Sequence, residues 1–363
     1  MDGLGALARR IARFPHAGDI PAEPRRFLIQ SAPSIADAVL FGAGAEAIRV
    51  AFPAAEIDVL AGPENQAIWR MAPGVRGVYV LEDAFLYLLA HQRGDFLASR
   101  ALLRSLRKRR YDVAINFLGD LAGNWALSQV GARSTIAHDS MGGGFFLSHP
   151  VARDFARVRM ADVMAEALAP LGIAEVPRPL LVPRERAIAE AIHLLRENRL
   201  RERGFLVCAP GASHAAAAWP TRRYAEALNA FAVPRGMPVV YVGSADETAM
   251  IDDLVRVTAA RSLNFAGLYL DILTALLARA AVYLGSDSGA SQIAAATGTP
   301  RVTLLPASVA ERVGTPGARS VVLVGPDCRP PRMRSSGWEP EPVCTVDVAV
   351  REVVDALTAV AGP

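Results

Sequence analysis

Lysine is almost missing from this chain of 363 residues: Lys108 is the only lysine among 39 lysine and arginine residues. Aromatic residues make up 7%, so the hydrophobic share of 52% consists largely of small side chains. That share excludes a chain that is disordered throughout, and the composition fits neither a collagen-like repeat nor a coiled coil. The formal net charge is only +3, and from it we expect no nucleic-acid partner.

Cysteine, histidine pairs and long apolar runs are also scarce. The three cysteines, Cys208, Cys328 and Cys344, are too few and too dispersed for a disulfide scaffold or a CxxC-type zinc site. The six histidines show no HxxxH or HExxH spacing, so we expect no metal site. No run approaches the roughly 18–20 apolar residues of a membrane span, and no signal-peptide core is present. We therefore expect a cytoplasmic protein.

Two basic segments leave peripheral contact with the inner face of a membrane open. Apolar residues recur at helical spacing in the N-terminal extension, with arginines between them, which fits a packed extension or an amphipathic helix on a membrane. Six basic residues fall between Arg100 and Arg110. They fit a solvated helix C-terminus, or a dock for an anionic acceptor or an anionic membrane surface.

Apolar strands alternate with helices along the chain, which predicts an α/β protein with doubly wound parallel sheets. The expected strands are 26–31, 56–61, 75–81, 112–117, 205–209, 238–242, 263–265, 281–285, 301–305 and 321–324. The expected helices are 35–52, 96–106, 152–171, 184–203, 221–231, 247–258, 270–280, 290–296 and 346–360.

A proline-rich segment at 176–183 predicts a boundary between two Rossmann-like domains. The expected parts are an N-terminal extension (1–25), an acceptor domain (26–183), a linker helix (184–203), a nucleotide-sugar domain (204–345) and a closing helix (346–363). We expect the two domains to face a central cleft, because open α/β sheets bind ligands in such a crevice.

Two strand-to-helix turns have the residues of an anion site. In the first, Asp287 or Ser288 can cap a helix, and Gly289 lets a ligand approach the backbone, where free N–H groups suit a phosphate. In the second, Gly211 and Ser213 follow a strand in the same way. An ordinary turn with a polar cap explains each pattern equally well.

Asp37 follows the first strand, near the start of a helix. A carboxylate in that position could accept a proton from a substrate hydroxyl. An acidic residue in the first turn of a helix is also favoured by the helix dipole alone, which is the commoner situation.

Taken in order, the motifs resemble those of glycosyltransferase family nine, the ADP-heptose:lipopolysaccharide heptosyltransferase family. The resemblance runs from about residue 26 to residue 357, and its specificity comes from the order of the pieces. The pieces are 34–40 (SIADAVL), 52–60 (FPAAEIDVL), 210–225 (with PGAS and WPTRRYA), 242–247 (VGSADE) and 285–300 (with GSDSG and AAATGTP).

The resemblance implies a GT-B fold and an inverting, metal-independent transferase without a cofactor. It would move a sugar, expected to be heptose, from an ADP-type donor to a lipopolysaccharide-core-like or other glycan or glycolipid acceptor. Asp37 would be the general base, Glu247 would bind the ribose and Asp287 would contact the sugar. The donor-binding set carried over is Gly211, Ser213, Arg223, Glu247, Asp287, Ser288, Gly289, Ala290 and Gln292.

Two positions depart from the family pattern. Many members have a histidine where this chain has Gln292, and a lysine where it has Ala217. These changes remove up to two positive charges from the diphosphate site, and charge-assisted hydrogen bonds are roughly twice as strong as neutral ones. Arg222 or Arg223 could compensate. The alternatives are a GT-B nucleotide-sugar epimerase, or a catalytically weak subunit that binds sugar nucleotides.

Overall fold

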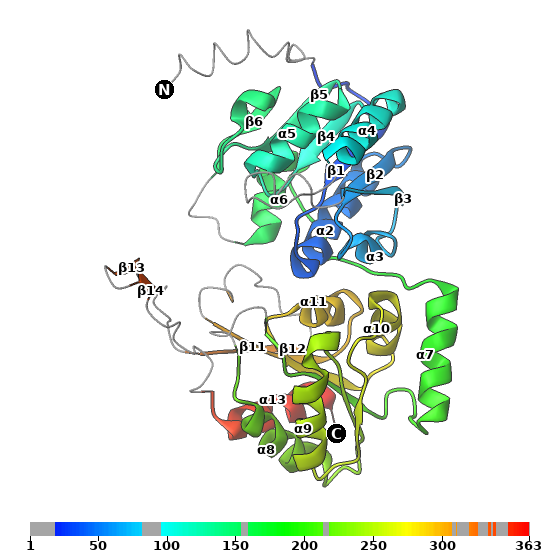
Figure 1. Cartoon of the computed structure of the whole chain (residues 1–363), viewed down its shortest axis with the longest axis vertical. Coiled ribbons are helices and arrows are strands. Elements are labelled where there is room, and N and C mark those ends of the chain that lie inside the picture. The colour runs from blue at the N-terminus through cyan, green and yellow to red at the C-terminus, as the bar shows by residue number, and fades with distance from the viewer. Residues whose placement is uncertain are drawn as a thin grey trace. The chain divides into compact units, whose positions relative to one another are not determined.

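The computed structural model describes residues 19–81, 96–153, 159–212, 218–306, 310, 319–325, 333–334, 337–338 and 348–362. The chain divides into two compact units, Met1–Leu180 and Leu181–Pro363. Each unit contains a six-stranded sheet with helices packed on it (Figure 1). The predicted α/β class, with two doubly wound parallel sheets, is confirmed.

The first sheet has the strand order β3-β2-β1-β4-β5-β6, and all neighbouring strands are parallel. Its strands are β1 (Arg26–Gln30), β2 (Glu56–Ala61), β3 (Val75–Val80), β4 (Val113–Asn116), β5 (Ser134–His138) and β6 (His149–Val151). The direction of winding reverses between β1 and β4. In open α/β sheets, ligands bind at the carboxyl ends of the strands at such a reversal.

The second sheet has the strand order β12-β11-β10-β7-β8-β9, again with parallel neighbours. Its strands are β7 (Leu206–Ala209), β8 (Val239–Tyr241), β9 (Ser262–Asn264), β10 (Val282–Ser286), β11 (Arg301–Leu305) and β12 (Ser320–Val324). Counted within each unit, the two orders are the same. The reversal in this sheet lies between β7 and β10.

Helices cover the first sheet on both faces. On one face α2 (Ile35–Ala51) packs against α6 (Met160–Leu168), and on the other α4 (Phe96–Leu106) packs against α5 (Leu121–Val130). A Cβ on Gly44 would lie 2.5 Å from the Phe117 ring, so a glycine lets α2 approach the sheet closely. A short helix, α3 (Gln66–Trp69), follows β2.

The second unit uses more helices. They are α7 (Glu185–Glu197), α8 (Thr221–Ala232), the 3₁₀ turn η5 (Ala245–Glu247), α9 (Thr248–Val257), α10 (Leu270–Leu277), α11 (Gly289–Ala296) and α13 (Val350–Ala361). α8 packs on α13, and α7 on α10. One apolar core joins α8, α9 and α13 to the sheet, with Trp219, Tyr224 and Phe231 almost fully buried.

Several elements differ from the prediction. α3, α5, β5 and β6 were not expected. In the region predicted as a helix over 152–171, the described residues form α6 and a 3₁₀ turn, Ala169–Leu171, and residues 154–158 lie outside the described residues. The helix predicted over 184–203 ends at Glu197, because Arg199 adopts φ 46° and the Leu200 N–H bonds the Leu195 carbonyl at 2.8 Å. This bond lets the buried Leu200 side chain fold back and stop the helix, as in a Schellman motif.

Some of the residues for which predictions were made lie outside the residues that the structure describes. They include most of the N-terminal extension, two of the three cysteines (Cys328 and Cys344) and Ser213. Among the helices that the structure describes, none has both the length and the apolar character needed to cross a membrane.

Candidate functional site

Asp37 lies where the central strand of the first sheet ends. Ser34 is the N-cap of α2, with extended backbone (φ −79°, ψ 150°), and its hydroxyl accepts a hydrogen bond of 2.9 Å from the Asp37 N–H. The same hydroxyl donates to Oδ2 of Asp37, also at 2.9 Å. The hydrogen bond from Ser34 orients the carboxylate. Asp37 is half-buried, so part of it is open to solvent. The cap and the first-turn acid are therefore one hydrogen-bonded pair.

In the second unit, the Glu247 carboxylate lies between the ends of two neighbouring strands. Its Oε2 accepts hydrogen bonds from the Ser244 N–H at 2.7 Å and from the Ser244 hydroxyl at 3.1 Å. A Cβ on Gly211, after β7, would collide with Oε1, and one on Gly243, after β8, would lie 2.6 Å from Oε2. Both glycines leave room for the carboxylate. Gly243 was not predicted as a site residue, although it immediately precedes the capping residue Ser244.

The turn between β10 and α11 presents the start of a helix. Ser288 is the N-cap, and its hydroxyl accepts from the Ser291 N–H. The N–H groups of Gly289 and Ala290 belong to the first turn, which an α-helix leaves without intrahelical acceptors. These N–H groups and the positive end of the helix dipole suit a phosphate or diphosphate.

The hydroxyl groups of two tyrosines contact serines of this turn. Neither tyrosine was predicted as a site residue. The Tyr224 hydroxyl lies 2.7 Å from the Ser286 hydroxyl, and the Tyr283 hydroxyl lies 3.5 Å from the Ser288 hydroxyl. A Cβ on Gly285 would collide with Tyr283, so a glycine is required above that ring. Burial is the main cause that raises the pKa of both phenols above their ordinary value. Both therefore remain neutral hydrogen-bonding groups at physiological pH.

The remaining residues considered for the donor site differ in exposure. Arg223 is half-buried on α8 and donates to the Val348 carbonyl at 3.3 Å, an oxygen that also accepts from the Trp219 indole at 3.1 Å. Gln292, on α11, is only 2% exposed. Arg222 pairs with Glu226, and its side chain is 91% exposed. Ser213 and Ala217 lie outside the described residues.

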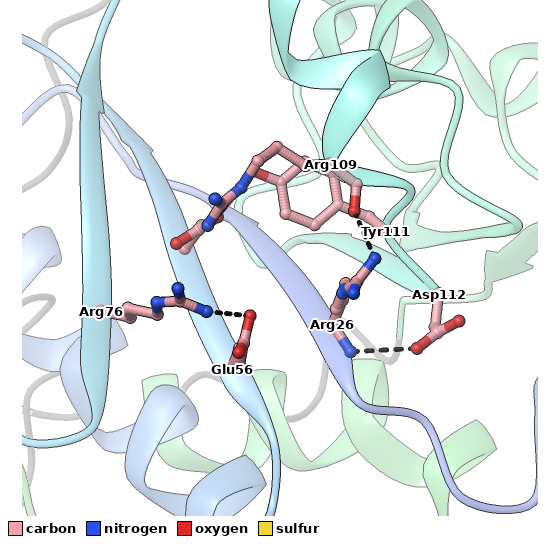
Figure 2. Close-up of polar contacts among 7 residues, drawn as sticks. Arg26, Glu56, Arg76, Arg109, Tyr111 and Asp112 are labelled. Carbon is pink, nitrogen blue, oxygen red and sulfur yellow. Dashed lines mark hydrogen bonds and ion pairs between the residues drawn. The ribbon is translucent and has the colours of Figure 1, made fainter.

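The basic stretch of the first unit lies at the opposite edge of its sheet from Asp37. Arg109, directly after α4, donates two hydrogen bonds (3.1 and 2.7 Å) to Oδ2 of Asp58, which also accepts from the Tyr111 hydroxyl at 2.9 Å. Asp58 is 2% exposed. Nearby, at the amino ends of β2 and β3, Arg76 forms an ion pair with Glu56 (Figure 2). Part of this stretch therefore stabilises the unit itself.

The chemistry at the two carboxyl edges is different. The first unit presents a carboxylate that can take a proton. The second unit brings Gly211 and Glu247 together and presents first-turn N–H groups next to Asp287. Among the described residues, no three His, Cys, Asp or Glu side chains gather in a group that could hold a metal ion.

Comparison with known proteins places this geometry in context. A family model described as Glycosyltransferase family 9 (heptosyltransferase) matches residues 99–335, more than half of the chain. The structure is similar to E. coli ADP-heptose lps heptosyltransferase II, with a TM-score of 0.73, 20% identity and coverage of 93% of this chain and 98% of that one. No protein of curated function matches the sequence.

Two further structures have the same fold. A glycosyl transferase family 9 protein from Veillonella parvula DSM 2008 aligns with a TM-score of 0.77 and 16% identity, covering 94% of this chain and 99% of that one. E. coli heptosyltransferase WaaC with ADP aligns with a TM-score of 0.68 and 17% identity, covering 83% and 93%. Both units thus correspond to the Rossmann-like units of GT-B glycosyltransferases.

Proposed function

Because the chain belongs to glycosyltransferase family 9, the heptosyltransferase family, we propose that it transfers a heptose from an ADP-linked donor to a hydroxyl of a lipopolysaccharide-core-like or other glycan or glycolipid acceptor. The observation that carries the proposal is the Ser34–Asp37 pair at the carboxyl end of β1. Similar structures, which include E. coli heptosyltransferase WaaC with ADP and with ADP-2-deoxy-2-fluoro heptose, support the choice of donor.

The proposed reaction inverts the anomeric carbon. Asp37 accepts the proton of the acceptor hydroxyl, and the oxygen attacks the anomeric carbon on the face opposite the diphosphate. As the new C–O bond forms, the bond from the anomeric carbon to the diphosphate oxygen breaks, and ADP leaves with the electron pair. General base catalysis of this kind typically contributes about 10²–10⁴-fold to a rate.

The second unit would hold the donor. First-turn N–H groups of α11 would bind the diphosphate, where negative charge increases as the bond to the sugar breaks. Oε1 of Glu247 would accept a hydrogen bond from a ribose hydroxyl, since Oε2 is already bonded to Ser244. Asp287 would contact the sugar. We propose that these groups act without a metal ion, so EDTA should leave the rate unchanged.

The test is Asp37→Asn, which keeps the shape of the side chain and removes the base. We expect kcat to fall by about 10²–10⁴-fold, while calorimetry gives the Kd of ADP found for the wild type. Asp120→Asn is the matched control, because Asp120 caps α5 at the end of the adjacent strand β4 and asparagine caps equally well. Undiminished transfer by Asp37→Asn would reject Asp37 as the base.

One assay separates the alternatives. Incubating the wild type with donor alone would interconvert the sugar if the protein were an epimerase, and we expect no such change. A panel of acceptors tests the other alternative: nucleotide binding without transfer to any acceptor would indicate a binding subunit.

A further inference from the structure

A short segment after β2 holds the loop that carries Ser34 and leads into the helix of Asp37. This loop, residues 31–34, connects β1 to α2, and its first residue continues the sheet through a bond of 2.9 Å from the Ser31 N–H to the Leu60 carbonyl. Beyond that bond, its polar groups are held by side chains from α3 and its N-cap. These side chains are Asn65 and Trp69, each 0% exposed.

Asn65 provides most of the hydrogen bonds. Its Nδ2 donates to the Ala32 carbonyl at 2.6 Å and to the Pro33 carbonyl at 3.1 Å, and its Oδ1 accepts from the Gly62 N–H at 3.2 Å. Asn65 is the N-cap residue of α3, yet its side chain makes no capping bond to that helix. An asparagine at this position ordinarily caps its own helix. Here both amide hydrogens are directed to the neighbouring loop instead.

Trp69 holds the start of the same loop. Its indole N–H donates to the Ser31 hydroxyl at 2.7 Å, and that hydroxyl donates to the Ala32 carbonyl at 2.9 Å. Ala32 and Pro33 immediately precede Ser34, which bonds both the backbone and the carboxylate of Asp37. Hydrogen bonds from the buried side chains thus fix the loop as far as Pro33, and the peptide bond joins Pro33 to Ser34, which bonds Asp37.

We propose that Asn65, assisted by Trp69, is a positioning residue for the Asp37 carboxylate. The inference rests on the proposed function, in which Asp37 is the base. A base that is displaced by about 1 Å from its productive position can lose about 100-fold in rate. Because the donor-binding residues lie in the other unit, loss of the Asn65 bonds should affect the chemical step and spare nucleotide affinity.

The test compares Asn65→Asp and Trp69→Phe with the wild type. Asn65→Asp keeps the shape and the acceptor for Gly62 but removes both donated bonds. Trp69→Phe removes the indole N–H together with the five-membered ring, and keeps an aromatic ring at this buried position. We expect kcat to fall by about 10–100-fold in the first and by about 3–10-fold in the second, with the Kd of ADP unchanged. Should Asn65→Asp fail to fold, Trp69→Phe carries the test.

A spectroscopic measurement makes the result independent of turnover. In protein labelled with ¹³C at aspartate carboxyls, the Asp37 resonance is assigned by its loss in Asp37→Asn. We expect that resonance to move in both test variants. Asn124→Asp is the control: Asn124 is also 0% exposed and donates to the His138 and Gly142 carbonyls, away from the loop at 31–34. It should lose stability without moving the resonance.

The outcomes are distinct. An unmoved Asp37 resonance in the folded test variants, or unchanged kcat in both, overturns the positioning role. If the wild type transfers no sugar to any acceptor, the proposed function fails. The resonance alone then decides whether Asn65 and Trp69 orient Asp37.

Discussion

The two units have the same strand order but different residues at the carboxyl edges of their sheets. In the first unit, a hydroxyl and a carboxylate are joined by hydrogen bonds after the central strand β1. In the second unit, Gly211 and Gly243 make room for the Glu247 carboxylate, and α11 begins after β10, the strand next to β7. One strand order therefore carries a carboxylate after the central strand in one unit and glycines and a helix start in the other, because the strand-to-helix turns differ.

The interiors differ as well. The first unit buries an ionised contact, Asp58 with Arg109, at the amino edge of its sheet. The second buries neutral hydroxyl pairs, Tyr224 with Ser286 and Tyr241 with Thr258, at 2.7 and 2.6 Å. The buried ion pair of the first unit and the tyrosine–hydroxyl pairs of the second should make the two units respond differently to mutation and to pH.

Breaking the buried ion pair should have the largest effect on stability. Arg109→Ala leaves the Asp58 carboxylate buried with only the Tyr111 hydroxyl as a donor. We expect the free energy of unfolding of the first unit to fall by about 3 kcal/mol, the low end for such pairs, because the Arg109 side chain is 36% exposed. Urea denaturation measures the change. Adding Asp58→Asn removes the charge and should recover most of it; no recovery would contradict the electrostatic cause.

Filling the space beside Glu247 should weaken nucleotide binding. Gly211→Ala forces the Glu247 carboxylate to move, which would remove its proposed hydrogen bond to the ribose. We expect the Kd of ADP to rise by about 10–100-fold, equal to about 1.4–2.8 kcal/mol. Calorimetry measures it. Gly62→Ala in the first unit is the control, because the nearest atom to its Cβ would be 3.9 Å away. Equal affinities in all three proteins would show that Gly211 is not required.

Alkaline pH should destabilise the second unit first. Burial raises the pKa of Tyr224, Tyr241 and Tyr283 above the ordinary value near 10, whereas only Tyr111 shows such a shift among the described residues of the first unit. The folded state then keeps protons that the unfolded state releases. The contribution of these phenols to stability is therefore constant below about pH 10 and falls above it.

Tyr224→Phe tests this mechanism through the slope of stability against pH. Above pH 10 each buried phenol contributes about 1.4 kcal/mol per pH unit, so removing one should lower the slope by that amount. Urea denaturation from pH 8 to pH 11 measures it. A slope identical to that of the wild type would mean that Tyr224 does not contribute to the alkaline loss of stability.

The smallest effect should come from a glycine that has no packing role. A Cβ on Gly42, in the interior of α2, would have no neighbour within 4 Å, in contrast to Gly44 on the same helix. Gly42→Ala should therefore raise the free energy of unfolding by about 0.5–1 kcal/mol. Thermal denaturation measures the gain. A decrease would indicate a contact that the structure does not contain.

Much of the fold could be predicted because the apolar strands are distinct and the helices between them are long. β5 and α5 were missed because the strand STIAH mixes polar and apolar residues although it is buried throughout. At the candidate site, Asp37, Glu247 and the turn at Ser288 were predicted from turn chemistry and family resemblance, and their roles stay predictions. Asn65 could not be found that way, because the residues it holds are about thirty positions away and only the fold brings them together.

The strand order also bears on how the chain folds. In both units the strand made first, β1 or β7, is central and needs partners on both sides, and one of these partners, β4 or β10, comes much later in the sequence. Contacts so distant in sequence slow folding, since a long loop must close before they form. During synthesis, one edge of β1 or β7 therefore stays unpaired until the fourth strand of that unit, β4 or β10, has been made. That interval is when the nascent chain is most exposed to aggregation.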